Sequence, residues 1–368
     1  MTMEMLMVKP WIAATIAAAA LVATAAPSVA ANETETFTVI SGLPGGHPAV
    51  RIFREHFRSL AQQQMAAAGD GMILKWRPAY DGTIAKHGDV LEAIADGVGD
   101  FGLIALDYET QKLPLQDISF HLPFSTTQCA VAAGAYHDLH KVSVDMNMPW
   151  QKAGQIYLAN ITTDGYGLFT GPKIKLIEDL RGLTMGVAVR IEPWLSGVAA
   201  KPFRMPLGQF DGALEANIID GAIMPVTQIA ELKLEERLNN YLLTEFGPQT
   251  AFAITMNGQR FADLPGPLRD ALLEAADQFV PVGARAYCDA GKNTLDASKK
   301  EGMRTQRFFN SRREQWVAAL PPLGQMWASA REAEGYPGKE ILTAYMDNLR
   351  AAGAKPKRDW DLDPAPTN

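Results

Sequence analysis

The chain has 368 residues and a formal net charge of −7, from 34 Lys and Arg against 41 Asp and Glu. Its basic residues are not clustered, which argues against nucleic acid as a partner, and a mildly acidic surface mainly favours solubility. The length exceeds what one hydrophobic core usually organises, so two domains are expected.

The first 31 residues have the features of a secretory signal peptide. Lys9 precedes the apolar run "WIAATIAAAALVATAA", and "PSVAAN" offers small residues for cleavage after Ala30 or Ala31. The alternative is a membrane anchor, but the run is shorter than the ~20 residues that a span needs, and no later segment is apolar enough to cross a bilayer. We therefore expect residues 1–31 to be removed and the mature chain to be exported and soluble.

A β-α-β-α-β rhythm follows the leader. "TFTVISGLP" predicts a strand, "HPAVRIFREHFRSLAQQQMAA" a helix and "GMILKWRPA" a second strand. "DVLEAIADGVGDFGLIAL" predicts a helix that stops at Gly97 and a buried strand that begins near Phe101. This order indicates a mostly parallel sheet with helices on its faces.

A second α/β unit follows the extended run "QIYLANITTDGYGLFT", which is expected to cross between domains. The strand "LTMGVAV", helices around "EPWLSGVAA" and in "LGQFDGALEANI", and the strand "DGAIMP" repeat the first pattern, and "TAFAITMN" (250–257) is expected to return to the first sheet. Two lobes joined by two crossings have a cleft between them, where such folds bind ligands.

The C-terminal region is predicted to be mainly helical. Residues 265–303 give one long helical pattern in which Pro281 is a candidate for a kink. A further helical region runs from Arg304 to about Ala352, and residues 353–368, rich in Pro and Asp, are expected to be frayed.

Cys129 and Cys288 lie 159 positions apart. Export to an oxidising compartment allows a disulfide, but both cysteines lie in apolar helical patterns where buried free thiols are common, so both alternatives stay open. His137 and His140 lie three apart on a predicted helix without a third ligand nearby, and we expect them at the surface. Neither a metal nor a cofactor is expected.

Motifs of catalysis are absent from the sequence: it has no G-x-S-x-G, no H-E-x-x-H, no P-loop and no G-x-G-x-x-G that opens a helix. The glycine-rich "SGLPGGHP" suits either an anion at a helix N-terminus or a plain turn. We expect no catalytic residue, although a triad assembled from distant residues is the alternative.

Five stretches, in order, resemble the substrate-binding proteins of TRAP (tripartite ATP-independent periplasmic) transporters, the DctP-type family. They are "DVLEAIADGVGDFGLI", "DISFHLPF", "GYGLFTGPKIKLIEDLRGLTMGV", "KPFRMPLGQFDGALEANIIDGAIMP" and "AFAITMNGQRFADLP". The resemblance implies a two-lobed α/β fold with two crossing strands and one long bridging helix. It implies a periplasmic receptor, not an enzyme, that closes over a small organic solute and delivers it to the small and large membrane subunits of the transporter. Outside this class, the rivals are a periplasmic enzyme on the same two lobes and the receptor of an ABC-type importer.

The predicted domain boundaries combine the pattern of strands and helices with the family resemblance. Lobe I is expected to comprise residues 32–160 and about 250–285, and lobe II residues 161–249. Residues from about 265 to 352 are expected to form the bridging helix and C-terminal helices that pack on both lobes.

Three positions depart from the family pattern. Members usually carry Lys-x-Arg where this chain has Thr184-Met185-Gly186, and that arginine holds the carboxylate of the solute with paired N–H donors. A second basic position corresponds to Gly167, and a common asparagine corresponds to Met224. All three departures make the expected pocket less charged and more apolar.

Two interpretations of the solute follow. In the first, Arg190, four residues beyond Gly186, replaces the missing arginine, and the solute is a small organic acid. In the second, the solute has no carboxylate and aromatic walls hold it. Asp107 is a candidate hydrogen-bond acceptor for the solute, or else a helix cap. The candidate wall residues, each of which could instead be core, are Tyr80, Phe124, Tyr166 and Trp194.

Overall fold

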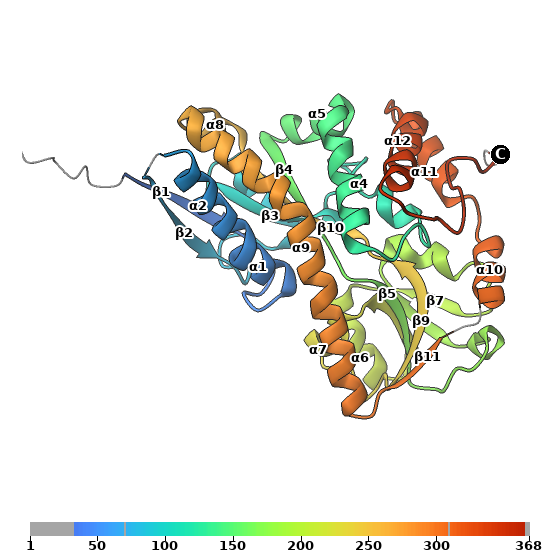
Figure 1. Ribbon diagram of the computed structural model, residues 1–368. Coiled ribbons are helices and arrows are strands. Elements are labelled where there is room, and N and C mark those ends of the chain that lie inside the picture. The colour runs from blue at the N-terminus through green and yellow to red at the C-terminus, as the bar shows by residue number, and fades with distance from the viewer. Residues whose placement is uncertain (1–32, 70, 308–309, 365–368) are drawn as a thin grey trace, which may run out of the picture.

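The computed structural model describes residues 33–69, 71–307 and 310–364. It consists of two β-sheets with helices around each, so the predicted α/β class and its two sheet-containing lobes are confirmed (Figure 1). The predicted signal peptide lies outside the described residues. Within the described part of the chain, no helix combines the length and the apolarity that a membrane span requires.

Lobe I contains a five-stranded sheet in the order β2-β1-β3-β10-β4. The first three strands are parallel, and β10 runs antiparallel to both β3 and β4. "TAFAITMN" therefore does return to the first sheet, as predicted. The strands are β1 (Thr34–Ile40), β2 (Ile73–Ala79), β3 (Phe101–Ala105), β4 (Gln155–Thr162) and β10 (Thr250–Asn257).

Helices cover both faces of this sheet because its strands carry apolar residues on alternate sides. Phe37 and Val39 pack with the helices that follow β1, whereas Ile40 packs with the helix before β3. The helices of lobe I are α1 (Pro48–Ile52), α2 (Arg58–Ala67), α3 (Val90–Ala95), α4 (Cys129–Val142), α5 (Val144–Lys152) and α8 (Gly258–Ala262).

Lobe II contains a six-stranded sheet in the order β11-β9-β5-β8-β6-β7. The antiparallel strand β5 lies between β9 and β8, and the remaining pairs are parallel. The elements are β5 (Tyr166–Thr170), β6 (Thr184–Val187), β7 (Lys201–Arg204), β8 (Gly221–Pro225), β9 (Asn240–Gly247), β11 (Arg304–Arg307), α6 (Phe210–Glu215) and α7 (Thr227–Glu231).

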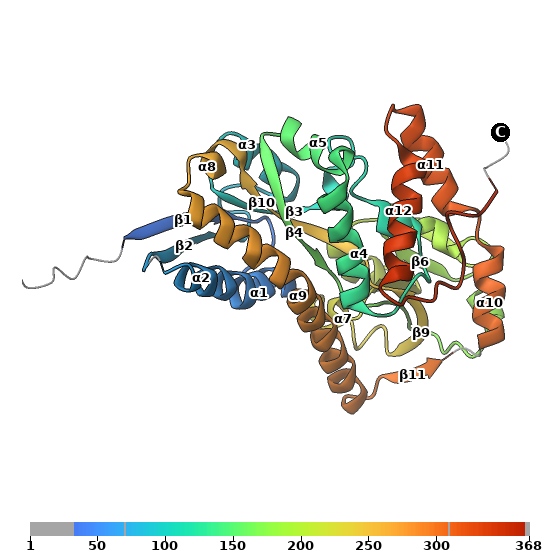
Figure 2. The ribbon, with the colours of Figure 1, turned by 45° about the horizontal axis from the view of Figure 1, so that its top comes forward.

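A single 35-residue helix, α9 (Gly266–Lys300), runs along both lobes (Figures 1 and 2). It packs against α2, α4 and β4 of lobe I and against α7 of lobe II. Cys288 of this helix forms a disulfide with Cys129 of α4, with a Cα–Cα distance of 6.3 Å. The disulfide alternative for the two cysteines is therefore the one that the structure adopts.

The C-terminal region corrects two predictions. Arg304 begins a strand rather than a helix, and helices follow it as α10 (Asn310–Ala319), α11 (Leu323–Ala333) and α12 (Gly338–Ala351). Residues 353–364 are packed rather than frayed: Trp360 is fully buried and its Nε1 donates to the Pro123 carbonyl at 2.9 Å. Arg350 also pairs with Asp359 and Asp361, and Arg358 donates to the Leu320 carbonyl at 2.6 Å, so the segment is anchored at several points.

The region around "EPWLSGVAA" also differs from its prediction. It forms a 3₁₀ segment, Val189–Leu195, with Pro193 inside it, instead of an α-helix. Proline removes a backbone donor, which disfavours a continuous α-helical ladder at this point.

Candidate functional site

The loops that follow the strands of the two sheets meet where the lobes join. Parallel strands β1, β2 and β3 end at Ile40, Ala79 and Ala105, so the loops after them lie at one edge of sheet I. In lobe II, β6 and β8 end at Val187 and Pro225, on the side where β5 begins. We call this region the interlobe edge. Carboxyl ends of strands are where open α/β sheets place ligands.

The glycine-rich loop after β1 packs tightly at this edge. A Cβ on Gly42 would lie 2.4 Å from the His87 backbone nitrogen, so only glycine allows the loops after β1 and β2 to approach this closely. His47 caps helix α1, and its Nδ1 accepts from the Ala49 N–H at 3.2 Å. Burial, together with His87 and Arg51 nearby, lowers the pKa of His47 to about 4, so the ring is neutral. The loop is therefore a capped turn.

Two segments cross between the lobes side by side. The first joins β4 to β5 and the second joins β9 to β10, and the Thr163 N–H donates to the Gln249 carbonyl at 2.9 Å. Asp164, in the first crossing, accepts from the backbone N–H and the hydroxyl of Thr227, at 3.0 and 2.9 Å. This carboxyl is buried, and burial raises its pKa to about 7, against hydrogen bonds from Thr227 that act in the opposite direction.

Arg190 lies at the interlobe edge and reaches from lobe II to lobe I. Its guanidinium forms an ion pair with Asp117 and donates from Nη2 to the Asp107 carbonyl at 3.3 Å. Both partners are largely shielded from water, with 12% of the Arg190 side chain and 7% of the Asp117 side chain exposed. The predicted replacement arginine thus already holds a carboxylate of the protein.

Asp117 is held by three groups. Trp327 Nε1 donates to its Oδ1 at 2.8 Å, and His121 lies 3.3 Å from its Oδ2, beside Arg190. Burial alone would raise the pKa of Asp117, but His121, Arg190 and Trp327 together lower it to about 2. Asp117 is therefore ionised at neutral pH. It was not among the predicted site residues, although it begins the stretch "DISFHLPF".

Asp107 lies at the same edge, where part of the residue is exposed and protein atoms crowd its carboxyl. Desolvation by the surrounding protein raises the pKa of its carboxyl, and the nearby Arg190 lowers it in part. Beside it, Tyr108 is 52% exposed and stacks on His87 with ring centroids 5.3 Å apart. Asp107, Tyr108 and His87 thus form a group of polar and aromatic side chains on the lobe I side, of which only Asp107 was predicted.

Three of the four predicted wall aromatics come together. Tyr166 and Trp194 have ring centroids 5.4 Å apart, and Phe246 connects Trp194 (5.0 Å) to Phe124 (5.0 Å). Trp194 is fully buried and its Nε1 donates to the Phe120 carbonyl at 2.8 Å. Tyr80 lies elsewhere, in the hydrophobic core that sheet I forms with helices α1, α2, α4 and α9.

The three departures from the family pattern share one face of sheet II. Gly167 pairs with Met224, and Gly186 pairs with Ala222 on the same strand as Met224. A Cβ on Gly167 would lie 2.1 Å from the Tyr241 ring, and one on Gly186 would lie 2.8 Å from Ile219 Cδ1. Met224 is fully buried. Apolar and aromatic neighbours fill the space that larger polar side chains would need.

No group of three or more metal-ligating side chains is assembled among the described residues. His137 and His140 are buried, contrary to the predicted surface position, because α4 packs under α9 and beside β4. His137 contacts Asp277 at 2.7 Å, and His140 contacts Gln116 at 3.0 Å. They are structural hydrogen-bonding groups of the core.

Known proteins share this architecture. The sequence model of the family described as bacterial extracellular solute-binding protein, family 7 (DctP) matches residues 48–330. A TRAP periplasmic solute-binding protein from Desulfovibrio salexigens is 17% identical, with a TM-score of 0.74 over 87% of this chain and 97% of that one.

Two further solved structures carry ligands. A TRAP solute-binding protein from Rhodoferax ferrireducens, in complex with copurified benzoate, is 18% identical with a TM-score of 0.72 over 86% of this chain and 98% of its own. One from Bordetella bronchiseptica, with bound (R)- and (S)-mandelate, is 19% identical with a TM-score of 0.70 over 86% and 99%. At sequence identities this low, these structural similarities show a common fold alone.

Proposed function

The chain belongs to bacterial extracellular solute-binding protein family 7, and from that premise we propose that it is the periplasmic receptor of a TRAP-type transporter. It would bind a small organic solute at the interlobe edge and hand it to the small and large membrane subunits. The observation that carries this proposal is the meeting of strand ends from two sheets beside paired crossing segments. A solute that touches both lobes gains its contacts only when they close, which couples binding to conformation.

The first candidate for the solute is a small organic acid that pairs with Arg190. Its guanidinium carries five N–H donors, and the protein uses two of its nitrogens, on Asp117 and the Asp107 carbonyl. The relatives described with benzoate and mandelate hold carboxylic acids, which favours the same class here. A solute carboxylate would share the arginine with Asp117.

The second candidate is an uncharged or aromatic solute, and two observations favour it. Asp117 already neutralises Arg190, and Asp107 adds a further carboxyl beside it. Tyr108 and His87 offer a stacked aromatic pair at the lobe I side, with Tyr108 half exposed. Such a site suits a flat solute that donates a hydrogen bond to Asp107 rather than a strongly anionic partner.

A thermal-shift screen of the mature protein separates these candidates. The panel contains organic, keto and aromatic acids together with uncharged osmolytes. A ligand at a hundred times its Kd stabilises the protein by about 2.7 kcal/mol, which gives a visible shift. Hits among acids support the first candidate, and hits restricted to uncharged compounds support the second. Recovery of a bound compound unchanged distinguishes a receptor from an enzyme that shares the fold.

Variants at the ion pair then test the role of Arg190. If it holds a solute carboxylate, Arg190→Ala lowers affinity by several kcal/mol, whereas Asp117→Asn, which frees the guanidinium, maintains or increases affinity. Arg181→Ala, which removes an exposed arginine before β6, serves as the control. Calorimetry that finds equal losses for the Arg190 and Asp117 variants would assign the pair to structure alone.

A further inference from the structure

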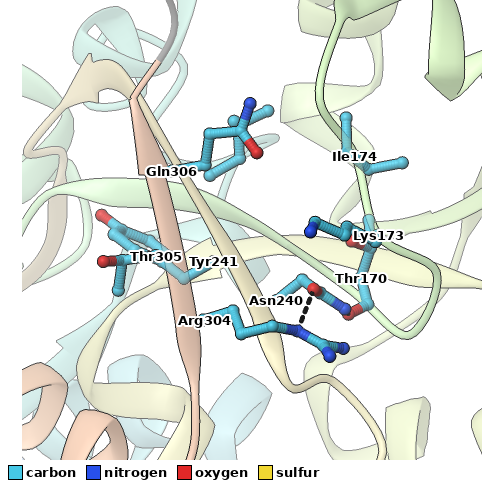
Figure 3. Close-up of a pocket in the computed structure, with 9 residues that line it drawn as sticks. Thr170, Lys173, Ile174, Asn240, Tyr241, Arg304, Thr305 and Gln306 are labelled. Carbon is cyan, nitrogen blue, oxygen red and sulfur yellow. Dashed lines mark hydrogen bonds between the residues drawn. The ribbon is translucent and has the colours of Figure 1, made fainter.

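A cavity lies at the end of sheet II opposite to the interlobe edge. Its volume is about 280 Å³, and Thr170, Asn240 and Arg304 are among the residues that line it, at the end of β5 and the starts of β9 and β11 (Figure 3). Strand β5 enters the sheet at Tyr166 beside the crossing and leaves at Thr170, roughly 13 Å further on at the usual strand rise. The cavity is therefore separate from the proposed solute site.

Two cations face this cavity from different segments. Lys173 comes from the loop after β5 and Arg304 from β11, and Figure 3 places Asn240 of β9 between them in the view. Neither has a carboxylate within 4.0 Å among the described residues, whereas the nearby Arg307 pairs with Glu245 at 3.1 Å and Arg312 pairs with Glu178 at 2.8 Å. Among the described residues, therefore, no carboxylate forms an ion pair with either cavity cation, although the net charge of the chain is −7.

Neutral amides fix the orientation of Arg304. Its Nε donates to Asn240 Oδ1 and its Nη2 to Asn239 Oδ1, both at 2.9 Å. These contacts hold the planar guanidinium in place through neutral partners, and no described residue accepts a hydrogen bond from Nη1. A guanidinium oriented in advance loses little side-chain entropy when it binds an oxyanion.

Several polar groups around the cavity bond to one another. Asn240 Nδ2 donates to the carbonyls of Thr170 and Gly171 at 3.1 and 2.6 Å, and the Thr170 hydroxyl donates to the Pro172 carbonyl at 2.7 Å. Lys173 and Arg304 are the charged residues among those described as lining the cavity, and none of these lining residues is acidic. A cavity lined by two cationic donors and no carboxylate favours an anion.

We propose that this cavity binds a free small oxyanion, a phosphate or a carboxylate-bearing compound, between Lys173 and Arg304. Its volume exceeds that of a bare ion and approaches the ~300 Å³ lower limit of small-molecule sites. Ile174 and Leu242 add apolar surface for the body of such a ligand. The site is distinct from the interlobe edge and operates independently of it.

Inorganic phosphate titrated into the mature protein by calorimetry tests the proposal. Wild-type protein should bind one phosphate per chain, and Arg304→Gln should weaken binding at least tenfold, as expected for the loss of a charge-assisted contact of about 1.5–3 kcal/mol. Arg304→Lys, which keeps the charge but loses the fork, should give an intermediate loss. Lys175→Gln removes the same charge from a neighbouring exposed position that does not line the cavity, and it should change the Kd less than twofold.

Three results would overturn the proposal. The first is no binding at 10 mM phosphate, a concentration about ten times a weak Kd of ~1 mM. The second is equal weakening of phosphate binding by Arg304→Gln and Lys175→Gln. The third is binding to phosphatidylglycerol vesicles without binding of free phosphate. The last result would assign the cations to a lipid headgroup. Arg304→Gln should leave thermal shifts by the interlobe solute unchanged, so failure of this site and failure of the receptor function remain distinguishable.

Discussion

Asp164 joins the two lobes through one carboxyl group. Its oxygens accept both polar hydrogens of Thr227, and a Cβ on Gly291 of α9 would lie 2.4 Å from its Oδ2. The group therefore sits where the first crossing, α7 and α9 converge. Little space and little water are left to solvate a charge there, which is why burial raises its pKa.

This pKa predicts how stability changes with pH. The pKa of Asp164 rises from 3.8 to about 7 on folding, so between these values the unfolded chain loses the proton while the folded chain keeps it. The free energy of unfolding therefore falls as pH rises from about 4 to 7, by up to about 4 kcal/mol from this group. Urea unfolding of wild type and Asp164→Asn across this range isolates the effect, because the variant cannot ionise there. Parallel pH profiles for the two proteins would contradict the assignment.

Gly167 provides a second test at the scale of one residue. The Tyr241 ring occupies the space beside it, so Gly167→Ala should cost about 1–3 kcal/mol of unfolding free energy through overpacking. In a Tyr241→Ala background, where the ring is gone, the same substitution should cost less than half as much. A double-mutant cycle from urea unfolding measures this difference. Equal costs in both backgrounds would mean that Tyr241 does not fill this position.

The disulfide fixes helix α4 to the bridging helix α9 of lobe I. Cys129 and Cys288 close a loop of 159 residues, and cross-links over long loops remove much of the conformational entropy of the unfolded chain. We expect Cys129→Ala/Cys288→Ala to lower the free energy of unfolding by about 2–5 kcal/mol. Dithiothreitol should destabilise wild type to a similar extent and leave the double variant unchanged. An effect of reductant on the double variant would point to a cause other than this bond.

At the scale of elements, strands that are buried throughout were predictable, and the two exposed edge strands of sheet II were not. Strands β3 and β8 are buried at every position, so they form continuous apolar runs in the sequence. Strands β7 and β11 lie at the two edges of sheet II, and nearly all of their residues are exposed. Only pairing with a neighbour makes them strands, so neither leaves a periodic signal.

The residues of the candidate site could also be predicted only in part. Arg190 and Asp107 could be placed near the strand ends from the sequence because each follows a recognisable strand at its carboxyl end, and their role in solute binding stays a prediction. Asp117 was missed because its partners Arg190 and Trp327 lie 73 and 210 positions away, and no local pattern relates them. Trp194 is close in sequence to Arg190, a predicted pocket residue, but its side chain is buried in the hydrophobic core between the lobes. Contacts of this kind depend on how the two lobes pack.

At the scale of the whole molecule, two ion pairs between described residues cross from one lobe to the other, and they differ in burial. Arg51 of α1 contacts Glu231 of α7 at 3.5 Å, with 40% and 32% of the side chains exposed. The pair of Arg190 and Asp117 is almost enclosed. Water and salt screen the exposed pair of Arg51 and Glu231 strongly and the enclosed pair of Arg190 and Asp117 weakly. The two pairs should therefore stabilise the contact between the lobes to different extents.

Single substitutions should reveal this difference. Arg51→Gln should cost less than about 1 kcal/mol of unfolding free energy, and the cost should vanish in 1 M NaCl. Arg190→Gln should cost about 3–5 kcal/mol, because it leaves the Asp117 carboxylate buried with only His121 and Trp327 as partners, and most of that cost should persist in salt. Urea unfolding at low and high salt measures both. A large, salt-insensitive cost at Arg51 would make that pair the principal ionic link between the lobes, and solute-driven closure would then have to be sought on the α1–α7 side.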